Sequence, residues 1–214
     1  MKHQWINRVG NRVLLIFFNG WGMDANVFAH LDATDVDVLM LYDYTDPTLP
    51  ELADGLEYPE IHLAAWSLGV YAAAFSALKL PIKSATAFNG TILPIDAVEG
   101  IDPVAFAATL NNWNEVGQKK FYRRIRGGSA FNEPQRPLEE QRAELMAVSE
   151  RAVQTVEPRL HFTRAFAGAN DRIFALAAQR ACWEKRNVPL IVLPEPHYLF
   201  GRYKFWKELF LYEN

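Results

Sequence analysis

Short apolar runs recur along this chain and alternate with longer helical runs, and this alternation constrains the fold more than any other feature. Nearly every residue in the short runs is hydrophobic, which is typical of strands buried on both faces of a parallel sheet. Helical runs follow several of these strands, at 23–31, 68–80 and 173–185. The alternation predicts an α/β fold with a mostly parallel central sheet flanked by helices. We expect strands at 13–18, 36–42, 61–65, 84–88, 160–167 and 190–193.

The beginning and the middle of the chain depart from this alternation. In the opening segment QWINRVGNR we expect a small hairpin at the sheet edge that turns at Gly10-Asn11. The region 91–159 contains no convincing strand. It offers instead helical segments near 103–113, 114–126 and 137–155.

Residues that favour helix ends support these segments. Asp102 followed by Pro103 is a good helix start, and Gly127-Gly128 is a good stop. The region is either an ordinary long helical connection or a helical cap over the end of the sheet, and its length favours the cap. We therefore predict a single α/β domain over residues 1–214, with a helical cap inserted after the sixth strand region, at about 91–159.

Charge and cysteine content narrow the class of protein. The net charge of −3 argues against a general nucleic-acid binder, which would carry a broad basic surface. The longest apolar runs are too short to span a bilayer, and the segment MKHQWINRVG lacks the apolar core of a signal peptide. The single cysteine, Cys182, cannot form an internal disulfide and reads as a buried apolar residue rather than a nucleophile. These features favour a cytoplasmic protein.

The stretch IHLAAWSLGVYAAAF places Ser67 between an expected strand and an expected Ala-rich helix. A serine at such a junction has the geometry of a nucleophile elbow, whose usual pattern is G-x-S-x-G. Here the pattern is Ala65-Trp66-Ser67-Leu68-Gly69, so the first glycine is replaced by alanine. The alternative is a serine that only caps the helix. We interpret Ser67 as a candidate nucleophile.

A serine hydroxyl needs a base, and in this arrangement an acid and then a histidine follow the serine in the chain. His197 comes directly after the last expected strand, and Asp171 follows the strand before it. Asp171 would orient the imidazole, although it could merely cap the helix that follows. Asp43 and Asp46 are backups that depart from the expected order. The remaining histidines are placed less well: His3, His30, His62 and His161.

The loop Gly20-Trp21-Gly22 leads from the first apolar strand toward a helical run. A loop at this position carries one oxyanion donor in serine hydrolases with a nucleophile elbow, and the residue after the nucleophile carries the other. We therefore expect the backbone N–H groups of Trp21 and Leu68 to form the oxyanion hole. Asn19 stands where the familiar loop opens with His, and an ordinary glycine turn is the alternative.

Together these motifs resemble the α/β-hydrolases and, more narrowly, the pimeloyl-acyl carrier protein methyl ester esterases of the BioG type. The resemblance implies an α/β-hydrolase fold and a serine esterase that cleaves a methyl ester on a carrier-bound pimeloyl group during biotin synthesis. It also implies Ser67 as nucleophile, Asp171 as acid and His197 as base. The segments that carry the resemblance are FFNGWGMDANVF, AAWSLGVYAAA, AFNGTILPID, GIDPVAFAATL, FYRRI, FAGANDRIF and PEPHYLFGRY.

The segment KKFYRRIR concentrates basic residues on one expected helix of the cap. A basic patch there suits an acidic acyl carrier protein and the phosphate of its pantetheine arm. The alternative is a solvated helix face, which is usual for charge runs. Arg142 and Arg151 could extend the patch. The candidate carrier-binding residues are Lys119, Arg123, Arg124 and Arg126.

We expect the acyl pocket to be an apolar tunnel between cap and sheet. Its candidate lining is apolar and helically spaced, although plain cap packing would explain the same residues: Phe106, Leu110, Trp113 and Phe121. No cluster has metal-ligand spacing, so we expect neither metal nor cofactor. Two alternatives to the carrier-ester esterase stay open, namely a thioesterase or short-chain carboxylesterase, and a catalytically silent scaffold that binds a partner.

Overall fold

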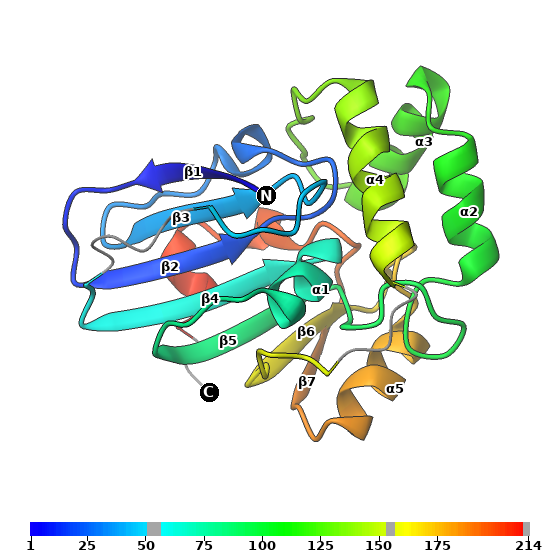
Figure 1. Ribbon diagram of the computed structural model, residues 1–214. Helices are drawn as coiled ribbons and strands as arrows, with labels where there is room; N and C mark the ends of the chain where they lie inside the picture. Colours follow the sequence, from blue (N-terminus) through cyan, green and yellow to red (C-terminus); the bar gives the residue numbers. More distant parts are fainter. Residues whose placement is uncertain (51–56, 153–156, 212–214) are drawn as a thin grey trace.

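The computed structural model describes residues 1–50, 57–152 and 157–211, and its centre is a seven-stranded sheet (Figure 1). The strand order is β1-β3-β2-β4-β5-β6-β7. All neighbouring strands run parallel except β1, which runs antiparallel to β3 at the edge. The predicted α/β class with a mostly parallel sheet is confirmed. The strands are Lys2–Asn7, Val13–Phe18, Asp37–Tyr42, Glu60–Trp66, Ile82–Phe88, Arg164–Gly168 and Leu190–Leu193.

Both faces of the sheet are covered, as the apolar strand sequences require. Because successive side chains of a strand point to opposite faces, Leu14, Ile16 and Phe18 of β2 join one core and Leu15 and Phe17 join the other. Helices α1 (Leu68–Phe75) and α5 (Leu176–Lys185) contribute to the first core. The second core is closed by the short turn η1 (Ala25–Phe28) and by the chain after β7, through aromatic residues such as Phe200 and Trp206.

The predicted opening hairpin is wrong. Strand β1 pairs with β3, so β3 separates it from β2. The Asp37 carboxylate at the start of β3 accepts hydrogen bonds from the N–H groups of Val9 and Gly10 and from the Asn11 amide. These bonds hold the 9–11 turn across the end of β3, which carries the chain past that strand instead of back along β1.

The predicted helix at 23–31 is reduced to η1, a single 3-10 turn. It ends early because the chain near Asp32 pairs with the C-terminal segment. Asp32 N–H donates to the Lys204 carbonyl, and Trp206 N–H donates to the Asp32 carbonyl. The backbone groups that would continue the helix are therefore committed to a segment more than 170 residues away in sequence.

Three helices come between β5 and β6 in the chain: α2 (Pro103–Asn111), α3 (Glu115–Arg126) and α4 (Leu138–Ala152). In space they lie beyond the carboxyl ends of the strands (Figure 1). We call α2, α3 and α4 the inserted helices. They follow the fifth strand rather than the sixth, because the opening segment supplies one strand instead of a hairpin. Asp102 caps α2 and Gly127 ends α3 with a φ of 60°, both as predicted. The end of the third predicted segment, 153–155, lies outside the described residues.

Candidate active site

Ser67 occupies a strained turn between β4 and α1. Its backbone φ is 57° and ψ is −127°, a conformation that L-residues adopt only where the surrounding structure enforces it. A Cβ added at Gly69 would lie 2.4 Å from the carbonyl oxygens of Phe18 and Asn19, so only glycine fits where the elbow presses on the end of β2. The Ser67 side chain makes no capping hydrogen bond to α1. The alternative of a simple helix cap is therefore wrong.

The fold brings the three predicted side chains into contact. His197 Nε2 lies 3.0 Å from Ser67 Oγ, and His197 Nδ1 lies 2.8 Å from Asp171 Oδ2. The His197 and Asp171 side chains are essentially inaccessible to solvent. Because an ionised carboxylate only accepts hydrogen bonds, Nδ1 of a neutral imidazole carries the proton and Nε2 faces the serine as an acceptor.

Asp171 also caps the turn that precedes α5. Its Oδ1 accepts from the N–H groups of Ile173 at 2.7 Å and Phe174 at 3.0 Å. The two interpretations of this residue are therefore compatible, since one oxygen holds the turn and the other meets His197. The backup acids lie elsewhere: Asp43 pairs with Lys2, and Asp46 accepts from Thr48 N–H.

Two buried amides support this arrangement, and the sequence reasoning missed both. Asn89, at the end of β5, donates through Nδ2 to the carbonyls of Pro196 at 3.0 Å and His197 at 2.8 Å. Gln179 on α5 donates through Nε2 to Asp171 Oδ2 at 3.3 Å. Two sequence signals pointed to Asn89: it is a polar residue directly after an apolar strand at the same sheet edge as Ser67, and it lies in the segment AFNGTILPID. Gln179 lies within an ordinary helical stretch and offers no such signal.

The predicted oxyanion residues lie beside Ser67. Leu68 is the first residue of α1, so its N–H has no partner within the helix. The Trp21 loop follows β2, and Trp21, Leu68 and Ser67 line one cavity. Asn19, which replaces the familiar histidine, is fully buried and its Oδ1 accepts from Gly20 N–H at 2.7 Å. The Asn19 side chain therefore fixes the start of the loop through a buried hydrogen bond.

The cavity beside Ser67, called here the serine cavity, holds about 480 Å³ of empty space, part of it open to solvent. Phe106 and Phe121 line it, as predicted for the acyl pocket. Trp113 instead lines a neighbouring groove, and Leu110 is among the residues packed into the core. The remaining lining includes Ile101, Leu145, Ile173, Arg124 and Arg172.

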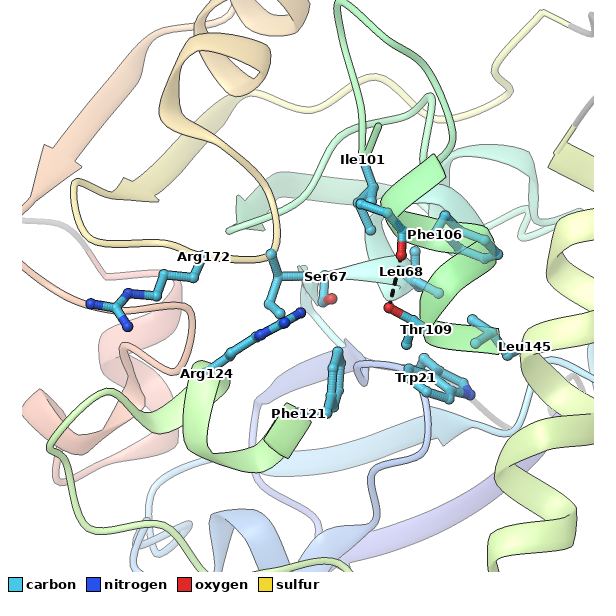
Figure 2. Close-up of a pocket in the computed structure, with 12 residues that line it drawn as sticks. Trp21, Ser67, Leu68, Ile101, Phe106, Thr109, Phe121, Arg124, Leu145 and Arg172 are labelled. Atoms are coloured by element: carbon cyan, nitrogen blue, oxygen red, sulfur yellow. Dashed lines mark hydrogen bonds between the residues drawn. The ribbon is translucent and has the colours of Figure 1, made fainter. Parts of the chain in front are cut away.

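The expectation of an apolar tunnel is wrong, because two arginines are among the residues that line the serine cavity and one guanidinium group reaches toward Ser67 (Figure 2). Figure 2 shows the Arg124 side chain reaching from α3 toward Ser67, whereas Arg172 extends away from it. Arg172 directly follows Asp171, so the turn that positions the carboxylate also places this cation at the rim. The periodicity of α3 did not indicate that Arg124 lines this cavity.

The basic residues of α3 are exposed and divide between two directions. Arg124 and Lys120 line the neighbouring groove, called here the outer groove, which shares Thr109 and Phe121 with the serine cavity. The outer groove lies between α2 and α3. The predicted residues that line neither space are Lys119, Arg123 and Arg126. Arg142 is exposed on α4, and Arg151 donates to the Thr45 carbonyl at 3.0 Å.

Cys182 is buried in α5, and burial raises the pKa of its thiol to about 11. We expect a thiol reagent such as DTNB to leave the native protein unmodified at pH 8 and to react fully once denaturant unfolds it, because the thiolate is the reactive form. Absorbance of the released chromophore measures the extent of reaction in the native and in the unfolded protein. Rapid modification of the native protein would contradict this burial and would make Cys182 a candidate nucleophile.

Within the described ranges, no group of three or more His, Cys, Asp or Glu side chains is arranged to hold a metal ion. In the same part of the chain, no helix combines the length and apolar character needed to cross a bilayer.

Comparison with known proteins relates the chain to one family along nearly its whole length. The family model described as "Pimeloyl-ACP methyl esterase BioG" matches residues 1–209. The crystal structure of BioG from Haemophilus influenzae superposes with a TM-score of 0.88 at 34% identity, covering 99% of this chain and 100% of that one. An alpha/beta hydrolase fold protein of Burkholderia ambifaria, 11% identical, has a TM-score of 0.58 over 92% of this chain and 87% of that one, a likeness of fold alone. The predicted α/β-hydrolase fold is confirmed.

A further relative is the malonyl-[acyl-carrier protein] O-methyltransferase of Bacteroides fragilis. It is 39% identical over 183 residues, which are 80% of this chain and 36% of that protein. The chain therefore spans about a third of the length of this relative.

Proposed function

Since the chain belongs to the BioG family of pimeloyl-ACP methyl esterases, we propose that it hydrolyses the methyl ester of a pimeloyl group carried on acyl carrier protein. Water and the ester give the carrier-bound acid and methanol. The carrier-bound acid would then enter biotin synthesis, and we propose that the reaction takes place in the cytoplasm. The observation that carries this proposal is the unbroken contact from Ser67 through His197 to Asp171, with distances of 3.0 and 2.8 Å.

In the proposed mechanism, Ser67 Oγ attacks the ester carbonyl carbon while His197 Nε2 takes the hydroxyl proton. Negative charge develops on the carbonyl oxygen, where the N–H groups of Trp21 and Leu68 would stabilise it. Collapse breaks the bond to the methoxy oxygen, which leaves as methanol with the proton from His197. A water molecule then attacks the acyl-enzyme by the same steps and releases the acid. Asp171 holds the imidazole and stabilises its charged form.

An acyl carrier protein is our proposed partner because two comparisons point to the same class of substrate. The family description names a carrier-bound ester, and the Bacteroides fragilis relative is named for methyl transfer to a malonyl group on acyl carrier protein. A methyl ester on a carrier-bound acid is the product class of such a transfer and the substrate class of an esterase. We therefore favour this substrate over the thioester or small-ester alternatives.

We further propose that the arm of the carrier runs through the outer groove. The groove adjoins the serine cavity through Thr109, Phe121 and Arg124, so a chain bound at Ser67 would leave between α2 and α3. Lys120 and Arg124 would lie beside the arm and suit its phosphate. Lys119, Arg123 and Arg126 are exposed on the same helix, and we assign them to the acidic surface of the carrier.

The double variant Lys119→Glu/Arg123→Glu tests the partner without touching the residues that line the cavity. We expect kcat/KM for the carrier-bound methyl ester to fall by about tenfold or more at low salt, because the carrier's acidic surface would meet like charge. Hydrolysis of a small methyl ester should stay within about twofold of the wild type, since exposed charges contribute little to the fold. Methanol release measures both substrates.

A matched control is Arg12→Glu/Lys79→Glu, which changes the net charge equally. Arg12 directly precedes β2 and Lys79 comes shortly before β5, so both lie at the opposite, amino edge of the sheet. This control should leave turnover of both substrates near the wild-type value. An equal loss on both substrates for the α3 variant, or no loss on either, would favour the small-ester alternative.

A further inference from the structure

The loop that carries Trp21 is held from the inserted helices rather than from its own strand alone. Glu144 Oε2 on α4 accepts from Gly22 N–H at 3.1 Å, and Gln141 Nε2 donates to the Gly22 carbonyl at 3.0 Å. The indole N–H of Trp21 donates to the Gln141 carbonyl at 2.6 Å. One helix therefore binds both polar groups of the Gly22 backbone and the side chain of Trp21.

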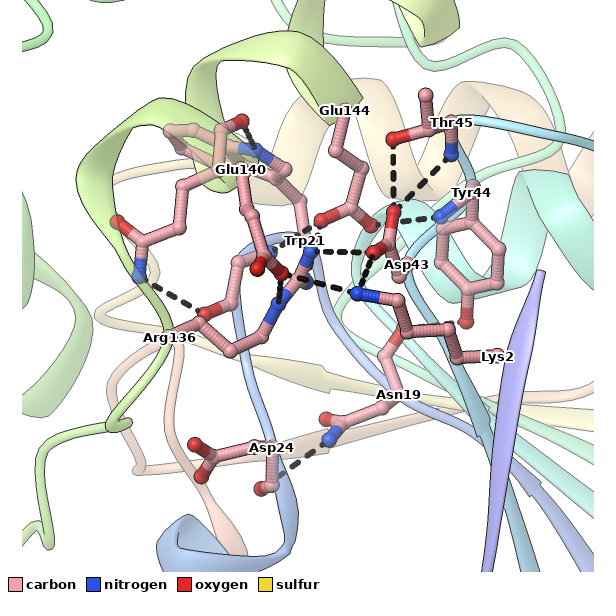
Figure 3. A network of polar contacts seen from close by, with 12 residues as sticks. Lys2, Asn19, Trp21, Asp24, Asp43, Tyr44, Thr45, Arg136, Glu140 and Glu144 are labelled. Atoms are coloured by element: carbon pink, nitrogen blue, oxygen red, sulfur yellow. Dashed lines mark hydrogen bonds and ion pairs between the residues drawn. The ribbon is translucent and has the colours of Figure 1, made fainter.

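Glu144 is fully buried, and hydrogen-bond donors surround its carboxylate (Figure 3). Besides Gly22 N–H, it accepts from Tyr44 N–H at 3.1 Å and from Arg136 Nη1 at 2.6 Å. Only an ionised carboxylate accepts from all of these donors without bringing a donor of its own. The Tyr44 hydroxyl in turn donates to the Asn19 carbonyl at 2.7 Å, so the Glu144 contacts reach both ends of the loop.

Gln141 is also fully buried and connects the loop to α3. Its Oε1 accepts from Gln118 Nε2 at 2.8 Å, and its Nε2 lies 3.0 Å from the Tyr122 hydroxyl as well as bonding Gly22. The α3 contacts therefore orient the same amide that holds the loop. Gln118 and the basic residues proposed to bind the carrier therefore lie on the same helix, α3.

The loop needs such support because its sequence is permissive. Gly22 has a φ of +72° and Gly20 has no side chain, so the loop loses much conformational freedom when it is fixed. An oxyanion donor lowers a barrier only if it already points at the developing charge. A small displacement of the Trp21 N–H would therefore reduce catalysis while leaving the substrate cavity in place.

We propose that Gln141 and Glu144 are positioning residues that fix the Trp21 N–H, so that the inserted helices complete the oxyanion hole as well as covering the cavity. This inference rests on the proposed function, because it assumes that Trp21 N–H meets an oxyanion.

The test uses a small methyl ester, so that it does not depend on the carrier. For Gln141→Met we expect kcat to fall by roughly 10- to 100-fold with KM nearly unchanged, as for loss of an oxyanion donor. The affinity for an alkyl trifluoromethyl ketone, whose adduct with Ser67 is a tetrahedral alkoxide, should fall by about the same factor as kcat. If Gln141 had a purely structural role, its replacement would not lower the inhibitor affinity and kcat by the same factor while leaving KM unchanged.

Two further variants keep the test decisive. Val148 is fully buried and lies one turn after Glu144 on α4. Val148→Ala shortens this side chain and should lower the melting temperature without changing kcat or inhibitor affinity. Gln118→Ala removes the hydrogen bond to Gln141 Oε1 from a half-buried position, and should lower kcat and inhibitor affinity together by a few fold. It provides the measurement if Gln141→Met does not fold.

Unchanged inhibitor affinity in the Gln141 and Gln118 variants would overturn the inference. So would losses of kcat that simply follow the melting temperature across all the variants, Val148→Ala included. A failure of the proposed function is distinguishable. If Ser67 were not a hydrolytic nucleophile, the wild-type protein would neither hydrolyse the small ester nor bind the ketone. If only the carrier assignment failed, the wild type would still do both, and the comparison among the variants would stand.

Discussion

Ser67→Ala is expected to lower kcat for methyl ester hydrolysis by about 10⁴-fold or more, because the residual rate would come only from the oxyanion hole and substrate binding. The fold should persist, since alanine differs from serine by one oxygen and the strain of the turn at φ 57° is present in both. Methanol release measures the rate, and thermal unfolding checks the fold. A fluorophosphonate should label Ser67 in the wild type, and His197→Ala should abolish that labelling.

Ser149→Ala is the matched control for this loss. Its hydroxyl bonds the Met146 carbonyl within α4, away from His197, so its removal should leave kcat unchanged. Retention of hydrolysis by Ser67→Ala would place the reaction at another group. If the wild type hydrolyses no ester and Ser67→Ala still binds the carrier, the silent-scaffold alternative would be favoured.

Asn89→Ala is expected to lower both stability and turnover. Its amide donates to the carbonyls of Pro196 and His197 and accepts from Gly168 N–H at 2.6 Å, and the last two of these bonds are fully buried. Leaving these groups without partners should cost about 3 kcal/mol or more of unfolding free energy. Displacement of the His197 loop should also lower kcat on the order of 100-fold, because small errors in placement reduce the rate steeply. Urea unfolding and methanol release provide the two measurements.

Part of that cost comes from the backbone, since Asn89 has a φ of 43° and alanine tolerates this region less well than asparagine. Asn187→Ala separates the two contributions. Asn187 has a φ of 53° but is exposed, and it lies away from His197, in the turn between α5 and β7. We expect this control to lose about 1 kcal/mol with kcat unchanged. Wild-type kcat in Asn89→Ala would contradict a role in holding the His197 loop.

The contact among Ser67, Asp171 and His197 was predictable because it depends on chain order and sheet direction. Each residue follows an apolar strand, and the carboxyl ends of parallel strands meet at one edge. Gly69 was predictable for a related reason, since an elbow pressed against the end of β2 leaves no room for a side chain. The catalytic roles of these residues stay predictions until the variants are measured.

The two wrong expectations about secondary structure share a different cause. The opening hairpin depended on Gly10-Asn11, but the Asp37 carboxylate holds that turn across β3. The helix at 23–31 was expected from local pattern, but Asp32 pairs with the C-terminal segment instead. In both cases a distant segment supplied hydrogen bonds that outweighed a local preference.

By itself, the sequence determined the strand and helix alternation, the sheet edge that carries Ser67, Asp171 and His197, and Gly69 of the elbow. These follow from local periodicity and from the short reach of a turn. Only the tertiary structure decided that Asn89 holds the His197 loop and that Glu144 binds Gly22 across 122 residues of sequence. Periodicity reports which face of an element is buried. It does not report which buried polar groups from distant segments will meet, because that depends on how the finished elements pack.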